Sequence, residues 1–87
     1  MRPMNYAILK LFEAGDMYDA EDVMTILKEE YHTFRAFKKV NVVESLMSAE
    51  KNFLLEQSHF NLDEEGELHI YYRATDLGKD MIRRFIK

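Results

Sequence analysis

The sequence predicts an α+β fold in which three helices precede a two-stranded β-hairpin and a fourth helix follows it. Apolar residues recur with a helical period in three segments before residue 52. Aromatic and branched residues then alternate on both sides of an acidic turn that contains a glycine. The length of 87 residues suits one compact unit, and we expect a single domain over residues 1–87.

The first helix is expected over residues 3–14. Pro3 suits a first helical turn, where its missing N–H group would have no partner, and Gly15 suits a left-handed C-cap. Four apolar residues should share the buried face, namely Ala7, Ile8, Leu11 and Phe12.

The second helix has the clearest start signal. Asp19 is a favourable N-cap, and Asp22 occupies the position that completes a capping box. Tyr18 and Val23 are spaced to pack across that cap as a hydrophobic staple. We expect this helix to end near residues 31–32.

The third helix is expected from an N-cap at Thr33 to about residue 51. On a helical wheel, one apolar group should face the core, namely Ala36, Val40, Val43 and Met47. The opposite, exposed face should carry Lys38, Asn41, Ser45 and Ser48, with Val42 and Ala49 beside them. Asn52 is expected to take the C-cap position, with the left-handed conformation that often ends a helix.

Residues 53–62 and 68–73 are expected to form the hairpin. The turn over residues 63–67 needs a left-handed residue, which Gly66 provides. This turn sets the apolar pairs Leu62/Leu68 and Phe60/Ile70 on one face. It sets Asn61/His69, His59/Tyr71 and Gln57/Arg73 on the other.

The fourth helix should begin at a Thr75 N-cap. An apolar row runs along this helix, formed by Leu77, Met81 and Phe85 with Ile82 and Ile86 beside them. A basic stripe runs along another side, formed by Lys79, Arg83, Arg84 and Lys87. The apolar row and the aromatic residues near the hairpin exceed what a small core absorbs. A homodimer through the C-terminal helix is therefore one hypothesis, and a self-contained core is the alternative.

The order of elements is that of a winged helix, with a helix-turn-helix core, a hairpin wing and a C-terminal helix. Residues 45–56, SLMSAEKNFLLE, resemble a recognition helix that runs into the first wing strand. Residues 71–79, YYRATDLGK, resemble a second wing strand that enters a T-x-x-G-K helix start. These segments resemble PadR- and MarR-like bacterial transcriptional regulators, in layout over roughly residues 4–87. The resemblance implies a core that binds double-stranded DNA, often as a dimer.

The charge distribution restricts where DNA could bind. The chain carries a net charge of −4, and its wing tip holds four carboxylates, Asp63, Glu64, Glu65 and Glu67, which repel phosphate. Residues 34–51 carry +2 instead. We therefore expect a DNA-binding regulator that uses the exposed face of the third helix, over about residues 34–51. Arg35, Lys38 and Lys39 are candidates for phosphate contacts, Asn41 for an adenine edge and Ser45 for a base or phosphate.

The acidic wing also supports a second hypothesis, an interaction module or adaptor that binds a protein and not DNA. The basic stripe and the polar helix face have a third interpretation, as ordinary solvated surfaces.

Catalysis is not expected. The chain has no cysteine, no phosphate-binding loop and no serine elbow. His59 and His69 alone supply too few ligands for a metal, so we expect no metal and no cofactor. No run approaches the roughly 20 apolar residues that span a bilayer, and no signal peptide is evident. A cytoplasmic location is expected.

Overall fold

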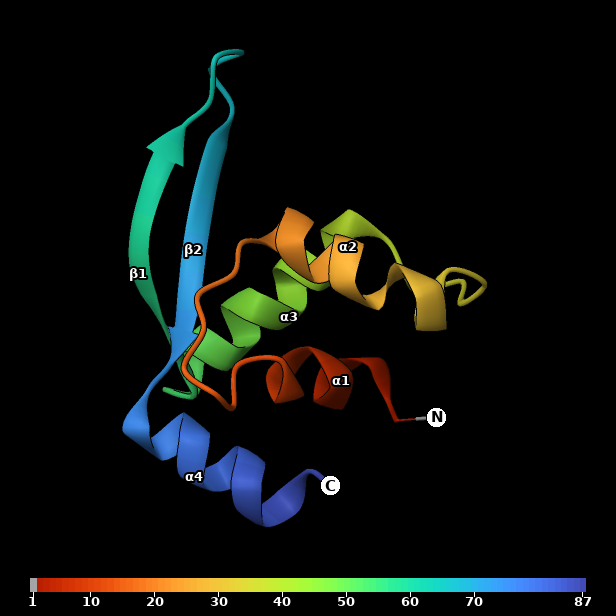
Figure 1. Cartoon of the computed structure of the whole chain (residues 1–87), viewed down its shortest axis with the longest axis vertical. Helices are drawn as coiled ribbons and strands as arrows, with labels where there is room; N and C mark the ends of the chain where they lie inside the picture. Colours follow the sequence, from red (N-terminus) through yellow and green to blue (C-terminus); the bar gives the residue numbers. More distant parts are fainter. Residues whose placement is uncertain (1) are drawn as a thin grey trace.

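The computed structural model describes residues 2–87 and has the predicted order of elements. Helices α1 (Met4–Lys10), α2 (Ala20–Tyr31) and α3 (Lys39–Lys51) pack together on one side of a hairpin. Strands β1 (Leu55–Leu62) and β2 (Leu68–Ala74) form this hairpin, and β2 is the strand nearer the helices (Figure 1). Helix α4 (Asp76–Phe85) crosses below the base of the hairpin. None of the helices described is long and apolar enough to cross a membrane.

Helix α1 is shorter than predicted. It ends at Lys10, and the chain then continues through tighter turns in which the N–H groups of Leu11 and Phe12 donate to the carbonyls three residues before them. Gly15 has a φ of +91°, so its left-handed conformation is confirmed, but the C-cap of α1 is Leu11 and not Gly15. Phe12 is fully buried in this turn, which carries it into the core.

The predicted start of α2 is confirmed. The N–H of Asp22 donates to the Asp19 carboxylate at 2.7 Å, and the N–H of Asp19 donates to the Asp22 carboxylate at 3.1 Å. This reciprocal pair is a capping box that satisfies two backbone donors at the helix start. Asp19 is only 4% exposed, which makes it the buried carboxylate of the core.

The predicted start of α3 is wrong, because the helix begins at Lys39 and not near Thr33. Residues 32–38 form turns, in which the N–H of Phe34 donates to Tyr31 and that of Phe37 to Phe34. The rings of Phe34 and Phe37 pack on the buried Tyr31 ring, with centroids 5.8 and 6.4 Å away. These aromatic contacts fold the segment back on the end of α2, so α3 cannot extend through it.

The predicted core face of α3 is also wrong. Val42, Leu46 and Ala49 are buried, whereas Val40 and Met47 are 61% and 47% exposed. Apolar residues cover about half of the circumference of this helix, so its pattern does not select which part of that arc is buried. The contacts with Phe12, Tyr31 and Leu55 in the core make that choice.

The hairpin has the predicted register near its turn and differs at its base. Leu62 pairs with Leu68, Phe60 with Ile70, Asn61 with His69 and His59 with Tyr71, as expected. A β-bulge at Ser58 then shifts the register, so that Gln57 pairs with Tyr72 and not with Arg73. The extra residue turns the buried Leu55 toward the helices.

Two features determine how the hairpin connects to α3 before it and to α4 after it. Asn52 is the C-cap of α3, as predicted, but the left-handed residue is Phe53, with a φ of +63°. At the other end, the Thr75 side chain caps α4 by accepting the Gly78 N–H at 2.9 Å, which confirms the predicted N-cap. The Thr75 N–H donates to the Leu54 carbonyl at 3.1 Å, so the start of α4 lies against the start of the wing.

We predict that Gly78→Ala destabilises the fold. A Cβ at this position would lie 1.9 Å from the Leu54 carbonyl oxygen, and backbone atoms cannot move away cheaply. The expected loss is at least about 2 kcal/mol of unfolding free energy, measured by urea unfolding. Gly66→Ala is the control, because its Cβ meets nothing within 4 Å and costs only the left-handed strain, about 1 kcal/mol. A Gly78→Ala protein as stable as the parent would contradict this close approach.

Candidate nucleic-acid interface

The segment before α3 carries an exposed basic surface. Arg35 and Lys38 are exposed, and neither forms an ion pair with any of residues 2–87. Both residues belong to the segment of turns over residues 32–38, which leads directly into the first turn of α3. The predicted cations therefore gather at one end of the helix and not along its whole face.

The N-terminus of α3 adds a partial positive charge to this surface. Lys38 is the N-cap residue, and no side chain caps the helix. The first N–H groups of an α-helix have no acceptor inside the helix, and together with the helix dipole they favour an anion. Arg35, Lys38 and this helix end therefore form a surface that suits phosphate oxygens.

The other three predicted site residues have partners within the protein. The Lys39 ammonium group pairs with the Glu21 carboxylate at 3.0 Å, and this contact raises the pKa of Lys39. The Asn41 amide donates to the Ala36 carbonyl at 2.8 Å. The Ser45 hydroxyl donates to the side-chain oxygen of Asn5 at 2.5 Å. Asn41 and Ser45 are half-buried and lie on the side of α3 nearer α1.

The outward face of α3 differs from the predicted polar face. Its exposed residues are Val40, Glu44, Met47, Ser48 and Lys51. The sequence-based prediction left Val40, Glu44 and Met47 out of the exposed face, because it assigned Val40 and Met47 to the core. The helical period could have brought them together, but only the packing of Leu46 shows which side is outward.

The acidic wing turn is held by one carboxylate. The Asp63 side chain accepts the N–H groups of Glu65 and Glu67, each at 2.9 Å. Gly66 has a φ of +82°, as the predicted turn requires. Glu64, Glu65 and Glu67 are exposed, so the wing tip presents negative charge to any approaching ligand.

His69 connects this turn to the start of α2. Its Nδ1 lies 2.8 Å from the Asp19 carboxylate, and its Nε2 lies 2.9 Å from the Asp63 carboxylate. The hydrogen bonds to Asp63 and Asp19 raise the pKa of His69 to about 9, so both nitrogens donate at neutral pH. His69 also lowers the pKa of Asp63. For Asp19, burial acts in the opposite direction, but hydrogen bonds from Asp22 and His69 hold its pKa below the usual value.

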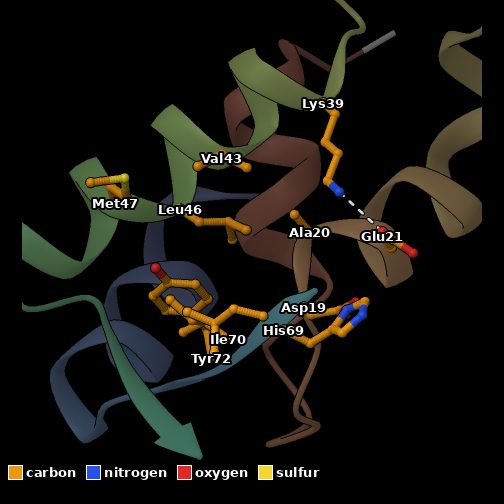
Figure 2. A pocket seen from close by; sticks show the side chains of 11 residues that line it. Asp19, Ala20, Glu21, Lys39, Val43, Leu46, Met47, His69, Ile70 and Tyr72 are labelled. Carbon is orange, nitrogen blue, oxygen red and sulfur yellow. Dashed lines mark hydrogen bonds and ion pairs between the residues drawn. The ribbon is translucent and has the colours of Figure 1, made fainter. Parts of the chain in front are cut away.

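A groove lies between α3 and the wing, as Figure 2 shows. It encloses a cavity of about 190 Å³. The Lys39–Glu21 ion pair lies at one end. Most of its lining is apolar, and these side chains come from α3 on one side and β2 on the other, namely Val43, Leu46, Met47, Leu68, Ile70 and Tyr72.

A cluster of possible metal ligands lies at the acidic end of this groove. Ligand atoms of Glu21, Glu67 and His69 lie within 4.8 Å of one another. A metal there would require His69 to lose its proton and at least one carboxylate partner. Glu21 already has the Lys39 ammonium group as its cation. His69 is protonated and is bound to Asp19 and Asp63, which are outside the cluster. The other wing histidine, His59, stacks on Tyr71 with the ring centroids 4.5 Å apart.

This arrangement of three helices, a hairpin and a final helix is a winged helix, and solved structures share it. PadR of Bacillus subtilis, in complex with operator DNA, matches the whole chain with a TM-score of 0.78 and 24% identity. A PadR-like transcriptional regulator of Bacillus cereus matches 93% of the chain and 75% of its own length, with a TM-score of 0.70 and 21% identity. These likenesses confirm the winged-helix fold that the sequence predicted.

The chain spans about half the length of the Bacillus subtilis protein, covering 49% of it. No protein-family model matches the chain, and no curated protein matches it either.

We predict that the His69 bridge makes stability depend on pH in the alkaline range. The pKa of His69 is higher in the folded state, so its contribution is complete below about pH 6.5 and is lost as the pH rises through about 9. Thermal unfolding between pH 6.5 and 9.5 should show a melting temperature that falls in the parent and is flatter in His69→Gln. His59 stacks on Tyr71 and takes no part in the bridge, so His59→Gln should keep the parental slope. Parallel slopes for the parent and His69→Gln would rule out the bridge as the cause.

Proposed function

We propose that the chain is a DNA-binding transcriptional regulator whose main contact surface is the N-terminal end of α3 with the segment before it. The observation that carries this proposal is the gathering of Arg35 and Lys38 at an uncapped helix N-terminus. The winged-helix fold supports it, and the Bacillus subtilis structure with that fold was solved with operator DNA.

Arg35, Lys38 and Lys39 are proposed to hold backbone phosphates. Arg35 and Lys38 are available for this role without breaking an ion pair, whereas Lys39 must leave Glu21 or share its charge with it. Asn41 and Ser45 remain candidates for polar contacts, in which case each exchanges its present hydrogen bond for one to DNA.

The outward face of α3 supplies a further set of contacts. Val40 and Met47 present apolar surface that suits a thymine methyl group, and the Glu44 carboxylate can accept from a cytosine amino group. The acidic wing tip is proposed to stay away from the phosphates. With so few cations, one chain would bind weakly, and the slope of log affinity against log salt concentration would be only about 0.9 for each phosphate contact.

We predict that Arg35→Ala combined with Lys38→Ala weakens DNA binding on the order of tenfold at low salt. The slope of log affinity against log salt concentration should fall by about 1.8, because each lost phosphate contact removes about 0.9. Fluorescence anisotropy with duplex DNA between 25 and 200 mM salt, roughly the range where this term dominates, measures both effects.

A matched control removes two positive charges elsewhere. Arg83→Ala with Arg84→Ala lowers the net charge equally but acts on the exposed side of α4, where Arg84 pairs with Asp80. Equal weakening by the two double variants would show that net charge, and not the α3 surface, drives binding. A parent protein that binds no duplex at low salt would refute the proposed function.

A homodimer through α4 is the second part of the proposal. Leu77, Met81 and Phe85 are 51%, 38% and 67% exposed, although they form an apolar row on this helix. A hollow of about 410 Å³ lies beside them, lined also by Tyr6 and Leu9 of α1. A second copy that covers this face would remove apolar surface from water and double the number of cations on DNA.

We predict that Met81→Glu combined with Phe85→Glu makes the protein monomeric in analytical ultracentrifugation and weakens DNA binding on the order of tenfold or more. Both side chains are exposed, so the monomer should stay folded by circular dichroism. The same substitution at the wing, Leu62→Glu, is the control for an exposed apolar residue away from α4. A parent that sediments as a monomer at all concentrations would contradict the dimer.

Three expectations from the sequence stay predictions. They are the single domain over residues 1–87, the cytoplasmic location and the absence of catalysis, and the proposed binding function is compatible with all of them.

A further inference from the structure

We propose that the groove between α3 and the wing binds a positively charged amphipathic helix of a partner protein. This inference goes beyond the proposed DNA-binding function and does not depend on it. It rests on the apolar lining of the groove, its size, the way its walls are built and the charge of its rim.

The apolar surface of the groove extends well past its cavity. Phe60 and Leu62 are 68% and 67% exposed, and they pair directly with Ile70 and Leu68 of β2. Directly paired residues in an antiparallel hairpin point to the same face, so all four side chains lie on the face that lines the groove. Val40 and Met47 continue this surface on α3. A monomer rarely leaves so continuous an apolar surface in water without a binding role.

The size of the cavity favours side chains over a free small molecule. Its volume of about 190 Å³ is below the range of roughly 300–1,000 Å³ that is typical of small-molecule sites. It suits one or two apolar side chains that enter from a partner, while the exposed residues around it contact the rest of that partner.

The walls of the groove present side chains and not backbone edges. On one side are Val43 and Met47 of α3, and on the other is Ile70 from the face of β2 (Figure 2). Leu68 of β2 also lines the groove. An extended peptide would need unpaired N–H and C=O groups along a strand edge, whereas a helix binds through a stripe of side chains. A helix with apolar residues at positions i, i+3 or i+4, and i+7 therefore matches this surface.

The rim determines the charge of the partner. Glu21 lines the groove, and Glu67 and Asp63 lie beside its lining residue His69. Glu64 and Glu65 add two exposed carboxylates in the adjoining wing turn. The cations nearby are Lys39 and His69, and both are already bound to carboxylates of the protein. The excess negative charge favours lysine or arginine on both sides of the apolar stripe of the incoming helix.

The location has a consequence for DNA binding. Lys39 lies at the end of the groove and also at the N-terminus of α3, where the proposed phosphate contacts are. A helix in the groove covers the side of α3 that faces the wing, including Met47. The bound helix and DNA should therefore exclude each other, so the partner would act as an antagonist of DNA binding.

The test is an NMR titration of the full chain, without DNA, with a synthetic Leu/Lys amphipathic peptide of about 14 residues, which forms about four helical turns. Three further peptides serve as comparisons, namely a Leu/Glu version, a scrambled Leu/Lys version and one with a proline in its centre. We expect the helical cationic peptide to shift the amide signals of Val43, Met47, Leu68 and Ile70. We expect the other three to bind at least about tenfold more weakly.

Protein variants locate the binding. Met47→Ser with Leu68→Thr should weaken the peptide at least about tenfold, and Leu62→Thr should weaken it less. Glu65→Gln with Glu67→Gln should weaken it several-fold and reduce its dependence on salt. Ile26→Ser is the matched control and should leave the affinity unchanged, because Ile26 of α2 is 44% exposed, close to the 47% of Met47, and does not line the groove. If Met47→Ser with Leu68→Thr does not fold, Leu62→Thr and the rim variant decide the question.

The remaining outcomes overturn the proposal. They are signal changes confined to α4 or to the acidic side of α2, equal binding of the scrambled peptide, or stronger binding of the Leu/Glu version. Groove signals that change on dilution without any peptide would assign the groove to a second copy of this chain. Loss of DNA binding alone leaves the groove proposal standing, because the titration contains no DNA.

Discussion

The buried carboxylate of Asp19 is the junction on which the shape of the functional surface depends. It caps α2 through the Asp22 N–H, and it accepts a hydrogen bond from His69 of the wing. His69 in turn binds Asp63, the residue that orders the wing turn. One carboxylate that is only 4% exposed thus connects the start of a helix to the tip of a hairpin. Because the Asp19 carboxylate is buried, loss of His69 would leave it with only the Asp22 N–H as a partner, which is costly for a buried charge.

This junction fixes the angle between the wing and α3, and therefore the groove between them. The isolated bridge between Tyr18 and Tyr72 supports the same arrangement, since their backbone groups exchange hydrogen bonds of 3.0 and 2.9 Å. A free two-stranded hairpin is marginally stable in water, so the wing needs these contacts to stand in one position. The close approach of Gly78 to Leu54 holds its base in the same way.

The charges of the molecule are separated by this geometry. Arg35 and Lys38 lie in the segment between α2 and α3, whereas the carboxylates of the wing tip and of Glu21 lie around the groove, where Lys39 pairs with Glu21. The surface that suits phosphate and the surface that suits a cationic helix thus adjoin at Lys39. A negative net charge is compatible with a local anion-binding surface when the two signs are kept apart in this manner.

Local signals in the sequence determined much of the fold. The capping pattern of Asp19 and Asp22, the cap at Thr75 and the turn at Gly66 act within four residues, and each was predicted with its role. The alternation of apolar residues fixed the register near the wing turn for the same reason. The acidic wing tip and the cations Arg35 and Lys38 were likewise visible as residue types at known positions.

Only the tertiary structure decided the start and the orientation of α3. Its apolar residues could have served more than one buried face. The packing of the Phe34 and Phe37 rings on Tyr31, together with the burial of Leu46, selected one. That choice turned Val40 and Met47 outward and moved Asn41 and Ser45 toward α1. The bulge at Ser58 and the His69 bridge also depend on residues far apart in the chain. The helix boundaries and the outward face could not be read from the sequence because long-range packing, and not local preference, supplies the energy that sets them.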